Sequence, residues 1–335
     1  MLTHYLKTAV RFLLRQRIYT VLNVLGLTIG MSCAIVIFLF VQDEWQYDQF
    51  HEKKDQIQRL ACTYYLPEDA GVEMNAIQGP VVGEMLVKDY PEITQAVRIQ
   101  SFSHLVLQFA EDNTRHFEDV AFADSNFFDL FSFPLLQGDA QTVLNQPHTI
   151  VLSESMARQY FGRTDVVGEF IRMPEETETA FEVTGVMADF PSQSHFKADF
   201  IASLQTRYKE GAYMGSWWSF QTYTYLELAK ETDVAALETK ISDISRRYIA
   251  DQEDGSGYRQ EYSLQPLTSI HLNSDLRGEW EANSKESYVI IFLIIGIFLV
   301  LIACVNFVNL ATARSLSRAK EVGLRKVVGA SRGQL

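Results

Sequence analysis

Two long stretches without a charged residue stand out in the pattern of hydrophobic and polar positions. The first runs from Ile18 to Gln42 and contains 25 residues, and the second runs from Ser287 to Ala313 and contains 27. At about 1.5 Å of rise per residue, a helix of either length crosses the roughly 30 Å hydrocarbon core of a bilayer. The second stretch includes an unbroken apolar run from Val289 to Val305. The pattern therefore predicts two transmembrane helices, at 18–42 and 287–313.

A cleaved signal peptide is the alternative interpretation of the first stretch, because basic residues precede it. Its apolar core is longer than such a peptide requires, and no small-x-small cleavage site precedes Asp43. Cys33 suggests a lipoprotein, but the three residues before it match that signal poorly and it lies in the middle of the stretch. A retained transmembrane helix is therefore favoured.

The region between the two stretches, residues 43–286, has the pattern of a mixed α+β domain. Residues 181–186 and 222–228 alternate between apolar and polar side chains, as half-buried strands do. Ser153 is a typical N-cap residue for a short helix that Gly162 ends. A further helix is predicted to begin at Asp233 and run through Ile249. Its buried face contains Leu237, Ile241 and Ile244.

Two clusters of aromatic residues in this region have two possible explanations. They could form a surface for an apolar ligand or partner, or they could pack in the interior. The second explanation is favoured, because large apolar side chains are usually buried. The clusters consist of Phe127, Phe128, Phe131 and Phe133, and of Trp217 and Trp218.

The charges are sorted along the chain. Residues 1–41 contain four basic residues and no acid, and residues 314–335 contain six basic residues and one acid, whereas the whole chain has a net charge of −13. Basic flanks remain in the cytosol, so both termini are expected there and residues 43–286 on the other side of the membrane. The acidic balance argues against binding to nucleic acid.

Motifs that would indicate an enzyme are missing from the sequence. It has no Gly-x-x-x-x-Gly-Lys-Ser/Thr loop for nucleotide phosphates and no Gly-x-Ser-x-Gly nucleophile motif. The seven histidines have no paired spacing, so no metal site, cofactor or catalytic residue is predicted. Cys62 is the one cysteine of residues 43–286, which excludes a disulfide within this region. Cys33 and Cys304 lie in the predicted spans, where small apolar packing is the expected role.

The segment after the second span, residues 317–335, is basic and contains an apolar stripe of Leu324, Val327 and Val328. Glu321 and Arg325 form a favourable i,i+4 pair. One interpretation is an amphipathic helix on anionic lipid. That interpretation explains the basic residues but not the two glycines, Gly323 and Gly329.

Several segments in order along the chain resemble the MacB/FtsX-type ABC transporter permeases. Glu-Val-Gly-Leu-Arg-Lys-Val-Val-Gly-Ala-Ser at 321–331, followed by Arg-Gly-Gln-Leu, is similar to the family's cytoplasmic coupling segment. Residues 11–17 and 26–30 resemble its first span. The remaining similar segments belong to its periplasmic core domain and lie at 47–52, 123–139, 150–157 and 183–191.

The resemblance implies a permease subunit that works by mechanotransmission, coupling ATP hydrolysis by a separate cytosolic ATPase subunit to export or extraction in the periplasm. It implies a bacterial inner-membrane protein whose periplasmic domain, 43–286, has two subdomains. It also implies a permease homodimer or heterodimer, with a periplasmic adaptor or outer-membrane component as a further partner. The family has four spans, so the third and fourth are expected beyond Leu335, and the chain is expected to be a fragment or a truncated gene product. Segment 317–335 would dock on the ATPase, and the residues expected at this contact are Glu321, Val322, Gly323, Leu324, Arg325, Lys326, Val328, Gly329 and Ala330.

Four residues within the spans are predicted to pack helices. Gly26 and Gly30 are four residues apart and permit close approach of another helix, including one from a second subunit. Asn306 and Asn309 share a face near the inner end of the second span, where polar side chains usually find partners on other helices. The alternative function for the whole chain is a two-span sensor, adaptor or scaffold whose periplasmic domain binds a ligand or an envelope protein.

Overall fold

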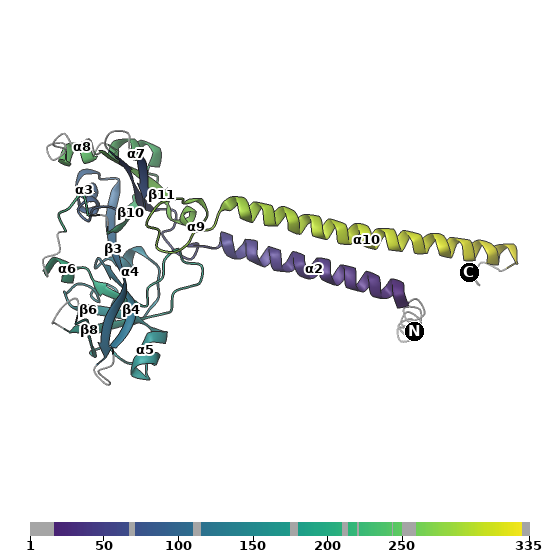
Figure 1. Ribbon diagram of the computed structural model, residues 1–335, viewed down its shortest axis with the longest axis horizontal. Helices are drawn as coiled ribbons and strands as arrows, with labels where there is room; N and C mark the ends of the chain where they lie inside the picture. Colours follow the sequence, from purple (N-terminus) through teal and green to yellow (C-terminus); the bar gives the residue numbers. More distant parts are fainter. Residues whose placement is uncertain are drawn as a thin grey trace. The chain divides into compact units, whose positions relative to one another are not determined.

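The computed structural model describes residues 17–66, 71–109, 115–174, 180–209, 214–219, 221–242, 244–249 and 259–329. The chain divides into two compact units, one built from its two ends and the other from Gln46–Lys285. The end unit contains the long helices α2 (Arg17–Trp45) and α10 (Glu286–Val327). The other unit contains the sheet (Figure 1).

Both predicted transmembrane helices are present. Val24–Trp45 and Glu286–Asn309 are long and apolar enough to cross a membrane. Most of their large apolar side chains are exposed, which distinguishes them from the core helices of a soluble protein. The fold class predicted from the sequence, two membrane helices flanking a mixed α/β domain, is therefore confirmed. Helix α10 continues without interruption beyond residue 313 as far as Val327, so the second span and the start of the basic tail form one helix.

Eleven strands within the described residues form a single mixed sheet, in the order β11-β1-β10-β3-β4-β9-β6-β8-β5. Strand β2 pairs with β1, and β7 pairs with β3 and β8. The pairs β4/β9 and β6/β8 are parallel, and the other pairs are antiparallel. The strands are β1 (Ile57–Tyr65), β2 (Val72–Asn75), β3 (Ile93–Phe109), β4 (Arg115–Ala123), β5 (Leu135–Gln137), β6 (Thr149–Ser153), β7 (Phe170–Arg172), β8 (Phe181–Met187), β9 (Phe200–Ser203), β10 (Tyr223–Leu228) and β11 (Arg259–Pro266).

Strand β3 connects the two ends of the sheet. At one end, α3, α7 and α8 cover β1, β10 and β11, and at the other end α5 packs on β6 and β8. The two ends correspond to the two predicted subdomains, although they share one sheet and form one compact unit. The helices are α3 (Val82–Asp89), α4 (Phe127–Leu130), α5 (Glu154–Phe161), α6 (Gln205–Lys209), α7 (Val234–Ile241), α8 (Ile244–Ile249), the 3₁₀ turn Leu267–Ser269 and α9 (Ile270–Asn273).

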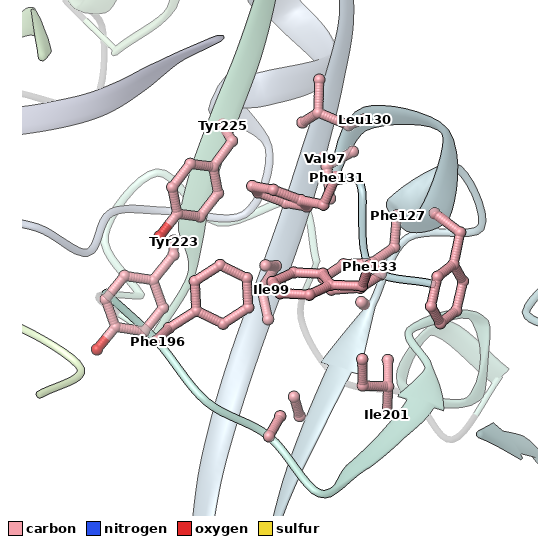
Figure 2. Close-up of a cluster of buried hydrophobic side chains, with 14 of the residues drawn as sticks. Val97, Ile99, Phe127, Leu130, Phe131, Phe133, Phe196, Ile201, Tyr223 and Tyr225 are labelled. Carbon is pink, nitrogen blue, oxygen red and sulfur yellow. The ribbon is translucent and has the colours of Figure 1, made fainter. Parts of the chain in front are cut away.

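The phenylalanine-rich segment packs in the centre of the domain. Figure 2 shows Phe127, Phe131 and Phe133 grouped with Phe196 beside strand β3. All four rings are buried, and the rings of Phe131 and Phe196 meet edge to face with centroids 5.3 Å apart. Each such side chain contributes about 1.5–3 kcal/mol through burial. The predicted core role is thus confirmed for this cluster, and Trp217 is buried in a second core region with Trp218 packed against it.

Local sequence signals correctly placed several elements. Ser153 accepts a hydrogen bond from the Met156 backbone N–H at the start of α5, and Gly162 ends this helix in a left-handed conformation with φ of 66°. The predicted strands at 181–186 and 222–228 are β8 and β10.

The helix predicted over 233–249 is instead two helices, α7 and α8. Helix α7 ends at Ile241, and α8 begins at Ile244. The predicted buried face is correct across the break, because Leu237, Ile241 and Ile244 all lie in the same core cluster.

Candidate functional site: the linkers next to the membrane helices

The segment that follows α2, Gln46–Glu52, is called the first linker. Asp48 lies at its centre, fully buried, with a φ of 58° that is uncommon for a residue other than glycine. Its backbone N–H donates to the carbonyl of Gln193 at 2.8 Å. A buried acid in this conformation persists only where its surroundings hold it firmly, so the first linker is rigidly fixed to the domain.

Asp48 is connected to the sheet through two further side chains. Its Oδ1 lies 2.9 Å from Nδ1 of His195, and Nε2 of His195 lies 2.8 Å from the hydroxyl of Tyr225 on β10. Burial raises the pKa of Tyr225 well above its ordinary value, so the phenol keeps its proton and donates to His195. His195 then donates from Nδ1 to Asp48. These hydrogen bonds, from the carboxylate of Asp48 through the imidazole of His195 to the phenol of Tyr225, link the first linker to strand β10.

His51 provides a second attachment of the first linker. Its Nδ1 accepts a hydrogen bond from the Ser132 backbone N–H at 3.1 Å, which places its own proton on Nε2. The ring is surrounded by Phe50, Phe131 and Phe133. Burial lowers the pKa of His51 to about 4, although the nearby charge of Asp48 acts in the opposite direction. The residue is therefore neutral in the folded protein.

A stability loss below neutral pH is expected from His51. The folded protein holds its pKa at about 4, whereas the unfolded chain has the ordinary 6.5, so the unfolded chain binds a proton first. The stabilisation is complete above pH 6.5 and falls as the pH drops towards 4, by about 3 kcal/mol in total. Chemical unfolding of the wild type at several pH values measures this loss. In the variant His51→Gln the free energy of unfolding should change much less between pH 6.5 and 4. An equal slope in the variant and the wild type would contradict the assignment of this loss to His51.

The segment that leads into α10, Ser274–Lys285, is called the second linker. It is held by Arg59 of β1, a residue only 1% exposed. The guanidinium donates to both carboxylate oxygens of Glu279, at 2.5 and 2.7 Å, and to the Ser274 hydroxyl at 2.9 Å. A paired arrangement of this kind combines charge with directional hydrogen bonds. The second linker is therefore fixed to the sheet as firmly as the first.

The two attachments meet at one place on the sheet. Arg59 of β1 and Tyr225 of β10 are direct partners in the register of the antiparallel pair. Side chains of such partners lie on the same face, with Cβ atoms about 5 Å apart. The buried hydrogen bonds that hold the two linkers therefore end on neighbouring residues of the sheet, Tyr225 for the first linker and Arg59 for the second.

The end unit has its own contact surface, where α2 and α10 pack along each other. A Cβ atom added to Gly26 would lie 3.0 Å from Nδ2 of Asn306, and one added to Gly30 would lie 3.0 Å from Cβ of Ala303. The two glycines thus face α10 of the same chain. Asn309 is exposed, and the part of the chain that the structure describes gives it no hydrogen-bond partner.

Enlarging Gly30 should weaken this helix pair. The change Gly30→Ile places a branched side chain against Ala303, at an expected cost of about 1–3 kcal/mol from overpacking. Cross-linking by a short bis-maleimide between cysteines placed at Phe40 and Phe292, whose rings have centroids 5.3 Å apart, would report the pairing in a background without Cys33 and Cys304. The yield should fall in Gly30→Ile. The matched change Val36→Ile, at a position 66% exposed, should leave the yield unchanged.

The residues predicted to contact an ATPase lie at the end of α10 and just beyond it. Leu324, Val327 and Val328 are 65%, 89% and 81% exposed. Gly323 has open space where a Cβ would be, and Gly329 has a positive φ of 92° that ends the helix. Ala330 and the basic residues Lys7, Arg11 and Arg15 lie outside the described residues.

The described residues contain no group of three His, Cys, Asp or Glu side chains that could hold a metal ion. Asp48, His51 and His195 lie near one another, but the two imidazoles are hydrogen-bonded to Asp48, Tyr225 and the Ser132 backbone N–H. This arrangement fits side chains that attach the first linker to the domain.

Comparison with known proteins identifies the domain. The model of the MacB-like periplasmic core domain family matches residues 20–244, which is more than half of the chain. The chain belongs to this family. No curated protein sequence gives a significant match.

Solved structures similar to this chain include three domains of permease and transporter proteins. A crystal structure of a permease-protein domain from Porphyromonas gingivalis has 22% sequence identity and a TM-score of 0.57, over 64% of this chain and 91% of that one. The periplasmic region of MacB from Actinobacillus actinomycetemcomitans has 14% identity and a TM-score of 0.43, over 63% and 90%. The extracellular domain of the ABC-type transporter YknZ from Gram-positive bacteria has 15% identity and a TM-score of 0.41, over 61% and 98%.

Membership of the MacB-like family establishes the general role of the chain. Its domain is the periplasmic domain of an ABC transporter permease, and with two candidate membrane helices the chain is an inner-membrane protein with a periplasmic segment. The family is a component of transporters that include an ATPase subunit.

The anchor residues of this MacB-like domain were missed by the sequence analysis. His51 and His195 were regarded as scattered, and Asp48 was not singled out. Asp48 and His195 are 147 positions apart, so no local spacing connects them. The one signal available was the similarity of residues 47–52 to the family, which includes Asp48 and His51.

Proposed function

We propose that the protein is a permease subunit of the mechanotransmission type. It couples ATP hydrolysis by a separate cytosolic ATPase subunit to export or extraction work in the periplasm. The observation that carries this proposal is the unbroken course of α10 over 42 residues. At about 1.5 Å per residue the helix is roughly 63 Å long, about twice the hydrocarbon thickness of a membrane. A displacement at one end is therefore carried to the other by a single stiff element.

The cytosolic end of α10 supports docking on a partner. Leu324, Val327 and Val328 expose apolar surface in a segment whose basic residues favour a cytosolic location. Apolar residues exposed together on a polar segment are typical of a binding surface. The proposed contact comprises the residues expected from the family resemblance, Glu321, Val322, Gly323, Leu324, Arg325, Lys326, Val328, Gly329 and Ala330.

The periplasmic end of the proposed path is the pair of anchored linkers. Asp48 attaches the first linker to β10, and Glu279 attaches the second linker to β1. Both attachments are buried and hydrogen-bonded, which favours transmission of movement over its absorption in flexible loops.

In this proposal both termini are cytosolic and residues 43–286 are periplasmic. The permease works as a dimer that can engage a periplasmic adaptor or outer-membrane component.

Affinity isolation of the native protein from membranes, followed by mass spectrometry, tests the proposal. A stoichiometric ABC ATPase among the companions is the expected result. Isolation without an ATPase, but with an envelope protein, would instead favour a sensor, adaptor or scaffold.

The proposed orientation has its own test. Protease added to spheroplasts should cut within residues 43–286 and leave residues 314–335 intact. Protection of 43–286 would refute the orientation.

A further inference from the structure

His271 lies where the two linkers come close to each other. It belongs to α9, the short helix between β11 and the second linker. The residue is 6% exposed. Its neighbours Ile270 and Leu267 are fully buried in the central core. His271 is therefore held in place by the domain itself.

The ring of His271 contacts the first linker. It stacks on the ring of Tyr47 with centroids 3.4 Å apart and planes inclined by only 3°. Tyr47 lies two positions after Trp45, the last residue of α2, and immediately before the anchored Asp48. The ring of Tyr47 is half-buried and that of His271 is buried, and a flat stack of two such rings is a directional contact that resists sliding and tilting.

The backbone of His271 contacts the second linker. Its carbonyl accepts a hydrogen bond from the N–H of Ser284 at 2.9 Å. Ser284 lies two positions before Glu286, the first residue of α10. One residue therefore contacts both linkers, each within two positions of a membrane helix.

We propose that His271 is a positioning residue that joins the two linkers, so that a displacement of either one is passed to the other directly as well as through the sheet. Its role in transport rests on the proposed function, but the joint itself is a property of this chain alone. The joint consists of two contacts made by α9. The ring stack of His271 on Tyr47 holds the first linker, and the hydrogen bond from the Ser284 N–H holds the second linker.

Hydrogen exchange of the full chain in lipid nanodiscs tests the joint. The variant Tyr47→Leu removes the stack, and exchange at the Ser284 N–H, on the other linker, should rise about five- to tenfold. The variants Tyr47→Phe and His271→Phe keep two flat rings and should retain the wild-type protection at Ser284. The variant Phe50→Leu is the matched control, because Phe50 lies in the same linker and packs its ring on His51 and Phe133, whereas the ring stacked on His271 is that of Tyr47. It should raise exchange in residues 46–52 only.

Two outcomes would overturn the proposal. One is unchanged exchange at Ser284 in Tyr47→Leu, and the other is an equal rise at Ser284 in Phe50→Leu. Exchange at β4 and β9 amides shows in each variant that the domain remains folded. No ATPase is present in this experiment. Its outcome therefore tests the joint at His271 alone and does not depend on whether the docking segment binds an ATPase.

Discussion

The change Leu324→Asp is expected to abolish co-purification of the ATPase with the permease. Leu324 is 65% exposed near the end of α10, in the middle of the proposed docking segment. A carboxylate buried in an apolar contact without a partner costs about 3–5 kcal/mol, which weakens association by roughly 100-fold or more. Quantitative pull-down from solubilised membranes measures the loss.

A matched control separates this contact from a general effect of charge on the helix. The change Ser315→Asp introduces the same group on an exposed position of α10 before the docking segment 317–335. Association should remain near the wild-type level in this variant. Equal retention of the ATPase by Leu324→Asp and Ser315→Asp would remove Leu324 from the docking surface.

The change Glu279→Ala should destabilise the periplasmic domain by about 3–5 kcal/mol. It removes the carboxylate that accepts two hydrogen bonds from Arg59, whose guanidinium is almost completely buried. The Nε of Arg59 already has no hydrogen-bond partner among the described residues, so the remaining contacts cannot compensate for the charge. Urea unfolding followed by tryptophan fluorescence, to which Trp280 next to Glu279 contributes, measures the change.

Glu281 offers the control for this prediction. It lies two positions further along the second linker and pairs with Lys197, but both side chains are about two-fifths exposed. Exposed ion pairs contribute less than about 1 kcal/mol, so Glu281→Ala should leave stability nearly unchanged. Similar losses in the two variants would mean that burial of the Arg59 pair is not what stabilises the linker.

Sequence patterns predicted those elements whose causes are local. Strands β8 and β10 and helix α5 follow from alternation and from the caps at Ser153 and Gly162. The single helix expected over 233–249 was wrong, because the apolar face continues from α7 to α8 and apolar periodicity does not reveal the break between them. A span at 287–313 and a coupling helix at 314–335 were predicted as separate elements, whereas α10 is one helix, since a loss of hydrophobicity after residue 313 ends a membrane span but not a helix.

The anchors of the linkers depend on contacts between distant parts of the chain. Arg59 and Glu279 are separated by 220 positions, and each on its own looks like an ordinary charged residue. Their significance comes from the pairing of β1 with β10 and β11, which no short window of sequence contains. The docking residues at 321–330 stay a prediction, because they rest on the family resemblance and on the exposure of Leu324 and Val328.

The position of β1 also determines the order in which the domain can be assembled. This strand is the first of the domain in sequence, yet it lies between β10 and β11, the last two. Its neighbours emerge about 160–200 residues later in synthesis. Sheets built from such remote pairings fold slowly, because the chain loses the entropy of closing a long loop before the stabilising contacts between strands form. Strand β1 can therefore pair with β2 as soon as both are made, but its contacts with β10 and β11 wait for residues 223–228 and 259–266, so the sheet closes around its first strand only when its last strand is available.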